Sequence, residues 1–337
     1  MNGLSRWQWS PILKTLMTIQ AVYFISYSGY LFALPLSEVG SVKRAGMAFY
    51  NQYKMNFAIT NLTLAAKAGD AEAQYFLAES IRNTNRAINE DVYKWYVLSA
   101  SQDNVYAMIQ LGRIGDDTCS AMGKCSGSLN TKNLWLQKAL ELTKPTAVRG
   151  DPEALCLMYE ITLEKEWLER SASAGYALAQ YWMAVGAKQG DGVYLPWRRH
   201  DAVINWLKQA AEGEYPPAMM DYAASIYEDK GDLSVARNWI IQTAENGYKS
   251  GVSSYGAYSA HVPSRYDFPL DLVKGYALTS LLVELDGGGD VQVYVNEVLP
   301  EIAQKMTPKQ ISAAEEFAKS WKATHPPLSF FPEKLSR

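Results

Sequence analysis

Small and large apolar residues recur along this chain in a fixed order between Ala73 and Gly256. A small residue is followed four positions later by a large apolar residue, and a second small residue comes directly after it. The copies, the third of them degenerate, are Ala73/Leu77/Ala78, Ala107/Leu111/Gly112, Ala154/Met158/Tyr159, Ala179/Met183/Ala184, Ala218/Tyr222/Ala223 and Gly251/Tyr255/Gly256. Residues four positions apart share one face of a helix, and small residues let two helices approach closely. Each copy therefore predicts a helix that packs tightly on a neighbour.

A second pattern alternates with the first: a Trp, then an Ala-rich stretch, then a Gly. It runs from Trp167 to Gly175, from Trp206 to Gly213 and from Trp239 to Gly247. The copy that begins at Trp95 has Asp in place of the Gly, and the copy that ends at Gly69 lacks the Trp. We expect each Gly to adopt a left-handed conformation that ends the second helix of a hairpin.

Such hairpins cannot bury their apolar faces alone, but a stack of them can, and it curves into a superhelix. The chain is therefore expected to be all-α, with a solenoid over residues 38–337 and a capping helix that begins at Thr307-Pro308. Ala154 and Ala179 are separated by only 25 positions, which predicts a shortened hairpin there.

The N-terminal region differs, because no charged residue occurs from Thr15 to Ser37. The 21 residues 16–36 are long enough to cross a hydrocarbon core of about 30 Å as a helix. Arg6 and Lys14 precede this stretch, which favours a cytoplasmic N-terminus and an exported solenoid. Residues 1–37 are therefore predicted to be a cytoplasmic stub and transmembrane anchor, in preference to a cleaved signal peptide or a buried soluble helix.

Composition agrees with a folded, exported protein. Hydrophobic residues make up 48% of the chain and charged residues 20%, and the net charge of −3 argues against a nucleic-acid partner. Cys119 and Cys125 lie six positions apart in a Gly- and Ser-rich loop, where a disulfide is preferred to a metal site because no other Cys or His is near in sequence. Cys156 lies in an apolar run and is expected to be buried.

The repeated residues resemble the Sel-one-like repeat (SLR) family, which is related to tetratricopeptide solenoids. The best copy runs from Ala177 to Gly213 and supplies an Ala-Leu-Ala-Gln start, a Gly-Asp-Gly-Val turn, Trp206 and an Ala-Ala-Glu-Gly end. The resemblance covers most of residues 41–322, and departures occur at 113–150 and 255–270. It implies a right-handed superhelical α-solenoid, and it is far more specific for fold than for function.

No catalytic pattern stands out. The three histidines, His200, His261 and His325, lie far apart in sequence, and there is no metal-ligand spacing, nucleophile elbow or phosphate-binding loop. We therefore predict a protein that is not an enzyme and that has no cofactor, no metal and no catalytic residues.

With no catalytic pattern in the sequence, the candidate functional feature is the concave surface of the solenoid. The first helix of each hairpin is expected to line the concave face, which makes its residues candidates for partner binding, with core packing between repeats as the alternative. These candidates are Gln74, Tyr75, Gln180, Tyr181, Trp182, Met219 and Asp221. The acids Glu79, Glu160, Asp221 and Glu228 suggest a partner with a basic or mixed face.

The resemblance also bears on function, since anchored or exported members of the family include immunity proteins that neutralise phospholipase-type effectors of type VI secretion. It implies an inner-membrane protein whose periplasmic solenoid binds a toxin. The alternatives are an adaptor that assembles an envelope complex and, from another class, an envelope hydrolase.

Overall fold

The computed structural model describes residues 36–114, 129–192, 195–285 and 289–335, and these residues form sixteen α-helices. Within those ranges the only β-type pairing is an isolated bridge between Tyr248 and Ser329. The expectation of an all-α chain is confirmed.

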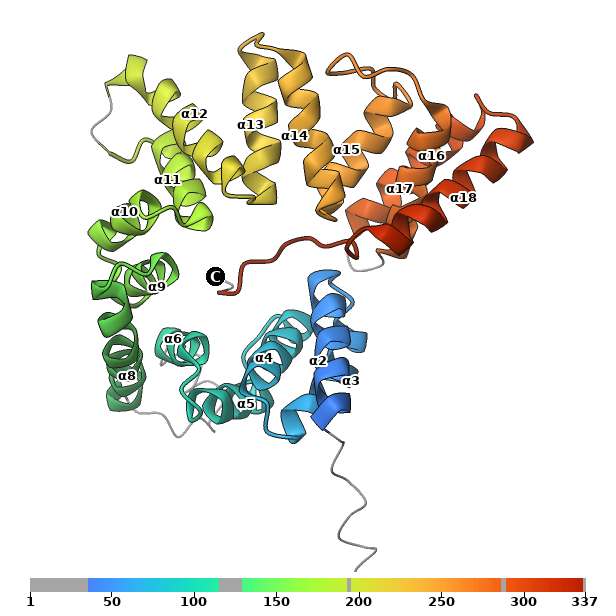
Figure 1. The fold of residues 1–337 in the computed structure, drawn as a ribbon. Coiled ribbons are helices and arrows are strands. Elements are labelled where there is room, and N and C mark those ends of the chain that lie inside the picture. The colour runs from blue at the N-terminus through green and yellow to red at the C-terminus, as the bar shows by residue number, and fades with distance from the viewer. Residues whose placement is uncertain (1–35, 115–128, 193–194, 286–288, 336–337) are drawn as a thin grey trace, which may run out of the picture.

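The helices form successive antiparallel pairs that follow one another along an arc (Figure 1). The first helices of the pairs are α2 (Leu36–Asn51), α4 (Ala71–Asn85), α6 (Val105–Arg113), α9 (Pro152–Thr162), α11 (Ala177–Gln189), α13 (Pro216–Glu228) and α15 (Lys249–Ser259). Their partners are α3 (Met55–Lys67), α5 (Glu90–Ala100), α8 (Leu129–Val148), α10 (Lys165–Ser173), α12 (Pro196–Glu212), α14 (Leu233–Glu245) and α16 (Leu272–Leu281). A 3₁₀ turn (Leu282–Glu284), α17 (Gly289–Ala303) and α18 (Pro308–Thr324) complete the array.

Most helices pack mainly against their neighbours in sequence, as expected of a solenoid, whereas α18 packs on α16. The small residues of the repeat pattern lie at these contacts: Ala73, Ala107, Ala179 and Ala218 are all completely buried. Gly251 shows why they must be small, since a Cβ at this position would lie 2.7 Å from the backbone of Thr243.

Four helix starts in the N-terminal half are fixed by side chains that accept a hydrogen bond from the third residue of the helix. Asp70, Asn89, Asn104 and Asp151 do this at α4, α5, α6 and α9. Thr307 does the same at α18, where it forms a capping box with Gln310, so the helix predicted from Thr307-Pro308 is confirmed.

Helix ends follow the predicted glycines with one exception. Gly69, Gly175 and Gly247 have φ values of +94°, +92° and +75°, which is the left-handed region that favours glycine. The prediction for Gly213 is wrong: its φ is −80°, and Glu214 has the positive φ instead. Gly213 is required for a different reason, because a Cβ there would lie 2.8 Å from the Cβ of Ala177.

The tryptophans of the second pattern occupy the helices that the pattern predicts, but none is completely buried. Trp95, Trp167, Trp206 and Trp239 are half-buried and pack along the edges of the apolar clusters. The shortened hairpin is α9 and α10, which have 11 and 9 residues and are joined by only Leu163 and Glu164.

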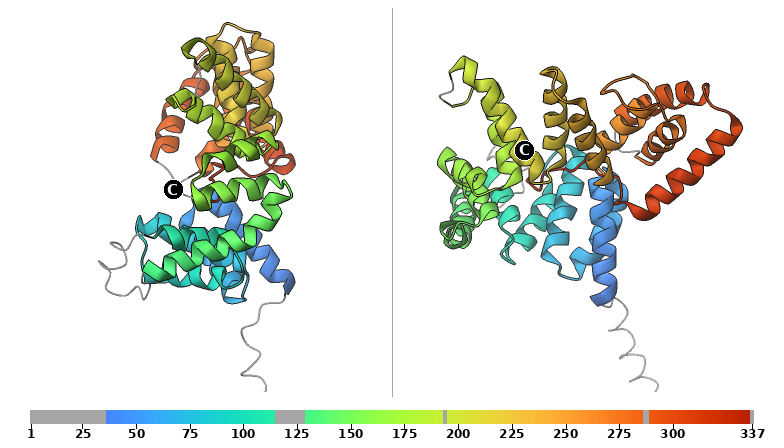
Figure 2. Two further views of the ribbon diagram at one scale, coloured as in Figure 1. Left: turned by 90° about the vertical axis from the view of Figure 1, so that its left-hand side faces the viewer. Right: turned by 45° about the horizontal axis from the view of Figure 1, so that its top comes forward.

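The arc nearly closes on itself. The N-terminal helices α2 and α3 lie close to the α15–α18 end of the array, and the C-terminal segment crosses the space enclosed by the arc (Figures 1 and 2). This crossing segment brings together residues that are distant in sequence.

Two predictions fall largely outside the described residues. The anchor of residues 16–36 reaches them only at its last residue, and among the described helices none has the length and hydropathy needed to cross a membrane. Cys119 and Cys125 lie in the undescribed range 115–128, whereas Cys156 is 4% exposed, as expected of a buried cysteine.

Candidate protein-binding groove

The C-terminal segment, residues 326–335, is extended and runs along the concave face. Its first part is held through the backbone: the Ser329 N–H donates to the carbonyl oxygen of Gly247 (2.8 Å), and the Lys249 N–H donates to the carbonyl oxygen of Ser329 (2.9 Å). The Phe330 N–H donates to the carbonyl oxygen of Asn51 (2.8 Å). The segment therefore connects the start of α15 with the end of α2, at the two ends of the array.

Gly247 permits this close approach. A Cβ at Gly247 would lie 2.8 Å from the carbonyl oxygen of Pro327, and its φ of +75° is itself unfavourable for other residues. Two phenylalanines that follow in the segment pack edge-to-face on rings of the array: Phe330 on Tyr53 (4.8 Å between centroids) and Phe331 on Tyr248 (5.8 Å).

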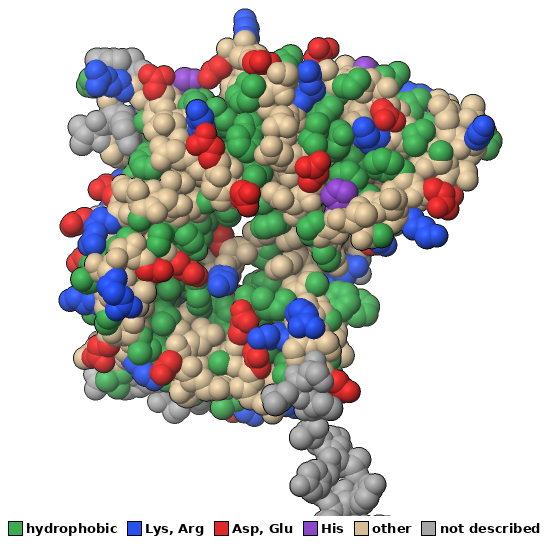
Figure 3. All heavy atoms as spheres, viewed as in Figure 1, with side chains coloured by type: hydrophobic (Ala, Val, Ile, Leu, Met, Phe, Trp, Pro, Cys, Tyr) green, Lys and Arg blue, Asp and Glu red, His purple; other side chains and the backbone are tan. Residues whose placement is uncertain are grey.

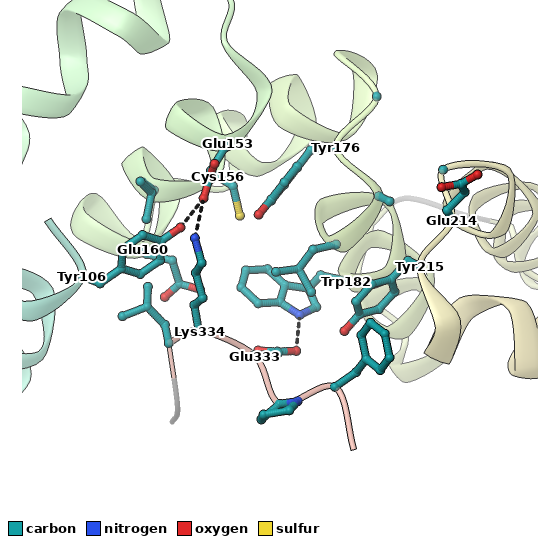
Figure 4. A pocket seen from close by; sticks show the side chains of 18 residues that line it. Tyr106, Glu153, Cys156, Glu160, Tyr176, Trp182, Glu214, Tyr215, Glu333 and Lys334 are labelled. Atoms are coloured by element: carbon teal, nitrogen blue, oxygen red, sulfur yellow. Dashed lines mark hydrogen bonds and ion pairs between the residues drawn. The ribbon is translucent and has the colours of Figure 1, made fainter. Parts of the chain in front are cut away.

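The second part of the segment, residues 331–335, contacts the groove through side chains (Figure 4). The indole Nε1–H of Trp182 on α11 donates to Glu333 (3.0 Å). The hydroxyl of Tyr75 on α4 donates to the carbonyl oxygen of Lys334. Leu335 is only 6% exposed and packs into the N-terminal apolar cluster.

Lys334 lies between a carboxylate and an aromatic ring. Its Nζ is 3.6 Å from Glu153 Oε1 and 4.9 Å from the ring centroid of Tyr106. The Tyr106 hydroxyl also donates to Glu153. Burial raises the pKa of Tyr106 well above its usual value, and the hydrogen bond to Glu153 raises it further, so the phenol stays protonated as a donor.

A cavity of about 400 Å³ lies beside this part of the segment, and its lining is aromatic and acidic (Figure 4). The aromatic side chains include Tyr176, Trp182 and Tyr215, and the carboxylates are Glu153, Glu160, Glu214 and Glu333. Burial raises the pKa of both Tyr176 and Tyr215; the largest further contribution comes from the negative charge of Glu153 at Tyr176 and of Glu333 at Tyr215. The space-filling view shows acidic and basic side chains around a central hollow (Figure 3).

The residues predicted to bind a partner separate into two groups. Gln74, Gln180 and Met219 are buried, with exposures of 4%, 6% and 2%. The amide nitrogens of Gln74 and Gln180 each donate to a backbone carbonyl of the preceding helix, Ala66 and Ala172 respectively, at 3.1 Å. These two amides therefore join the helices of adjacent repeats.

The second group faces the groove or lies next to it. Tyr75 and Trp182 both hold the C-terminal segment, although Tyr75 is itself buried. The Tyr181 hydroxyl donates to Asp221 on the next first helix (3.0 Å), so this pair bridges two repeats.

The expectation that Glu79 and Glu160 present a surface charge is wrong. Glu79 is completely buried and accepts hydrogen bonds from the Tyr96 hydroxyl and from Gln110 Nε2 (3.0 Å). Glu160 is 5% exposed and is paired with Arg113. Both carboxylates are satisfied inside the array.

Sequence reasoning missed the C-terminal segment and several groove residues, namely Tyr106, Glu153, Tyr176 and Tyr215. One signal was available: Tyr176, Tyr215 and Tyr248 each stand immediately before a first helix in three successive repeats. The corresponding positions in the earlier repeats carry the capping residues Asp70, Asn104 and Asp151. Tyr176 and Tyr215 line the cavity, so the recurrence of tyrosine in place of a capping side chain was the sequence signal for these two residues.

Across the described ranges, no three His, Cys, Asp or Glu side chains come together in an arrangement that could hold a metal ion.

No family model and no curated protein matches the chain. Among solved structures, the chain is similar to c5321, a protective antigen present in uropathogenic Escherichia coli strains that displays an SLR fold, with 17% identity and a TM-score of 0.46 over 85% of this chain. It spans 61% of the length of that protein.

A second similar structure is a Sel1 repeat protein from Oxalobacter formigenes, with 18% identity and a TM-score of 0.39 over 70% of this chain and 96% of that one. The chain is similar to Sel1-repeat proteins. The names of both solved structures refer to the Sel1-like repeat, which is the family that the repeated residues of this sequence resemble. At these identities the similarity concerns the fold alone.

Proposed function

We propose that this protein is a membrane-anchored, periplasmic repeat scaffold that binds another protein in its concave groove. The observation that carries the proposal is the C-terminal segment, an extended polypeptide already bound along that face. The groove holds it with backbone hydrogen bonds at Gly247 and Asn51 and with side chains of α4, α6, α9 and α11. A surface that binds one extended segment in this way has the donors and rings to bind another.

The location rests on the N-terminal sequence. The uncharged stretch ends at Ser37, and α2 begins at Leu36, so no linker separates the proposed anchor from the solenoid. The positive charges of Arg6 and Lys14 before the stretch favour export of the solenoid. The groove would then face proteins of the periplasm.

The specific role that we favour is that of an immunity protein, which binds and neutralises an antibacterial effector of the phospholipase type. This part rests on the resemblance to the Sel-one-like repeat family. A curved array suits it, because such a surface can surround a protruding part of a toxin and keep it from its substrate.

The test is affinity capture from native membranes with the full chain as bait. The tag belongs at the N-terminus, because residues 331–335 lie in the groove and a tag that follows them would disturb the binding surface. Capture of one stoichiometric partner with a lipase or other toxin domain would support immunity. Capture of several envelope-assembly proteins would point to an adaptor, and capture of no protein would contradict the scaffold.

A further inference from the structure

The C-terminal segment is bound to the groove unevenly along its length. Ser329 and Phe330 are fixed by backbone hydrogen bonds to Gly247, Lys249 and Asn51. Within the described part of the chain, no backbone–backbone hydrogen bond involves residues 331–335. The second part is therefore the one that can leave the groove while the first stays attached.

The polar side-chain contacts of Glu333 and Lys334 are partly open to water, whereas the carbonyl oxygen of Lys334 accepts from the buried Tyr75 hydroxyl. The side chains of Lys334 and Glu153 are 51% and 47% exposed, and ion pairs at such exposure contribute little to stability. Glu333 is half-buried and is held by one hydrogen bond from Trp182. An incoming segment with equivalent side chains can replace these contacts.

The charges that remain in the groove determine which side-chain charge the incoming segment must carry. When residues 331–335 leave, Glu333 and Lys334 leave together, and Glu153 loses its cation. Glu160 keeps Arg113 as its partner, so that arginine stays engaged. The vacated site at Glu153 and Tyr106 then combines a carboxylate with the face of an aromatic ring, which favours a lysine or arginine side chain.

The position of Leu335 adds an apolar requirement. This side chain is 6% exposed and belongs to the apolar cluster that includes Tyr75, Tyr106 and Leu157. Its departure exposes apolar surface to water, which an aliphatic side chain of the incoming segment would cover again.

We infer that residues 331–335 are an internal ligand of the groove, and that the partner displaces them with an extended segment containing Lys or Arg followed directly by an aliphatic residue. The inference rests on the proposed function, since it describes the partner that the scaffold binds. It goes further by assigning the binding site to Tyr75, Tyr106, Glu153 and Trp182 and by making the chain's own residues 331–335 a competitor. Partner segments without a cation are expected to bind more weakly, because they would lack both the ion pair with Glu153 and the contact with the face of the Tyr106 ring.

The experiment uses the full chain and a synthetic peptide of residues 331–337, labelled at its N-terminus, with binding followed by fluorescence anisotropy. An intramolecular occupant acts at an effective concentration in the millimolar range, so the wild-type chain is expected to bind the peptide only weakly. Lys334→Glu places a like charge against Glu153 and releases the segment. We expect this variant to bind the peptide at least about tenfold more tightly than the wild type does, since each tenfold corresponds to about 1.4 kcal/mol.

Lys322→Glu is the matched control. Lys322 pairs with Glu284 at the same exposure, 51% for both side chains, but it lies on α18, and neither residue lines the cavity. This variant makes the same change in net charge and is expected to bind the peptide as weakly as the wild type. Introducing Glu153→Gln into the Lys334→Glu chain keeps an acceptor for Tyr106 but removes the charge, and it should abolish the gain.

The inference is overturned if a folded Lys334→Glu chain, checked by circular dichroism, binds the peptide no better than the wild type. Equal tightening by Lys322→Glu would also overturn it, because the effect would then be one of net charge. Its failure is distinguishable from failure of the scaffold. A partner captured equally well by the wild-type and Lys334→Glu chains would uphold the scaffold and reject the internal ligand. Specific peptide binding in the absence of any captured partner would uphold the internal ligand and reject the scaffold.

Discussion

Gly213, at the end of α12, lies against Ala177, the first residue of α11, so closely that a Cβ on Gly213 would be 2.8 Å from the Cβ of Ala177. Its φ of −80° is one that any residue adopts. The glycine is therefore required by packing between the helices of one hairpin and not by backbone conformation.

The first prediction follows from that contact. Gly213→Ala should lower the free energy of unfolding by about 1–3 kcal/mol, since overpacking forces the backbone of a well-packed contact to shift. Adding Ala177→Gly to Gly213→Ala should recover part of the loss, which a double-mutant cycle of urea unfolding would detect. Gly69→Ala is the contrasting variant, because a Cβ there meets nothing within 4 Å and the cost would come from a φ of +94° alone. Additive effects of the Gly213 and Ala177 changes would refute the packing explanation.

The solenoid was predictable from the sequence because its contacts are local. Ala73 and Ala107 are small since helices adjacent in sequence touch there, and that requirement repeats with every hairpin. The C-terminal segment has no such repetition. The contact between Tyr75 and the carbonyl oxygen of Lys334 joins residues 259 positions apart, and no pattern near either residue encodes it. The candidate site was therefore only partly predictable: Tyr75 and Trp182 follow from the repeat, whereas Glu153 and Tyr106 have their role only because the arc closes.

The second prediction concerns Trp182, whose indole N–H holds Glu333. Trp182→Phe removes that hydrogen bond but keeps an aromatic ring, so residues 331–335 should leave the groove more often. Trypsin cleaves after lysine, and cleavage after Lys334 should become severalfold faster, because proteolysis follows the population of the open form.

Trp167→Phe provides the control for this measurement. Trp167 donates the same kind of hydrogen bond, to Glu164 at 3.0 Å, but this bond spans the first turn of α10. Its loss should leave cleavage after Lys334 unchanged. If both variants accelerate cleavage equally, the hydrogen bond to Glu333 does not hold the segment.

The third prediction is a pH dependence at Tyr266, which lies in the loop between α15 and α16 and is 8% exposed. Burial raises the pKa of Tyr266 to about 12 from its ordinary value of 10.0. Between these values the folded state keeps the proton that the unfolded state loses, so stability from this group is present below pH 10 and falls as the pH rises toward 12. Tyr266→Phe should remove that part of the loss in the free energy of unfolding at alkaline pH. A pKa difference of this size corresponds to about 1–3 kcal/mol. The measurement is urea unfolding of both chains from pH 9 to pH 12, and parallel curves would contradict the prediction.

The fourth prediction concerns Glu79, which is completely buried between Tyr96 and Gln110, with Arg82 Nη1 3.7 Å away. Glu79→Ala would remove the acceptor of the hydrogen bonds from the Tyr96 hydroxyl and from Gln110 Nε2, and it would remove the carboxylate beside Arg82. Removing one member of a buried charged network costs about 3–5 kcal/mol, so the melting temperature should drop by several degrees or more. Glu79→Gln keeps one acceptor oxygen and should cost less.

Glu72→Ala on the same helix removes a carboxylate that is 47% exposed and should change stability by less than about 1 kcal/mol. Equal losses for Glu79→Ala and Glu72→Ala would show that burial of the network has no energetic consequence.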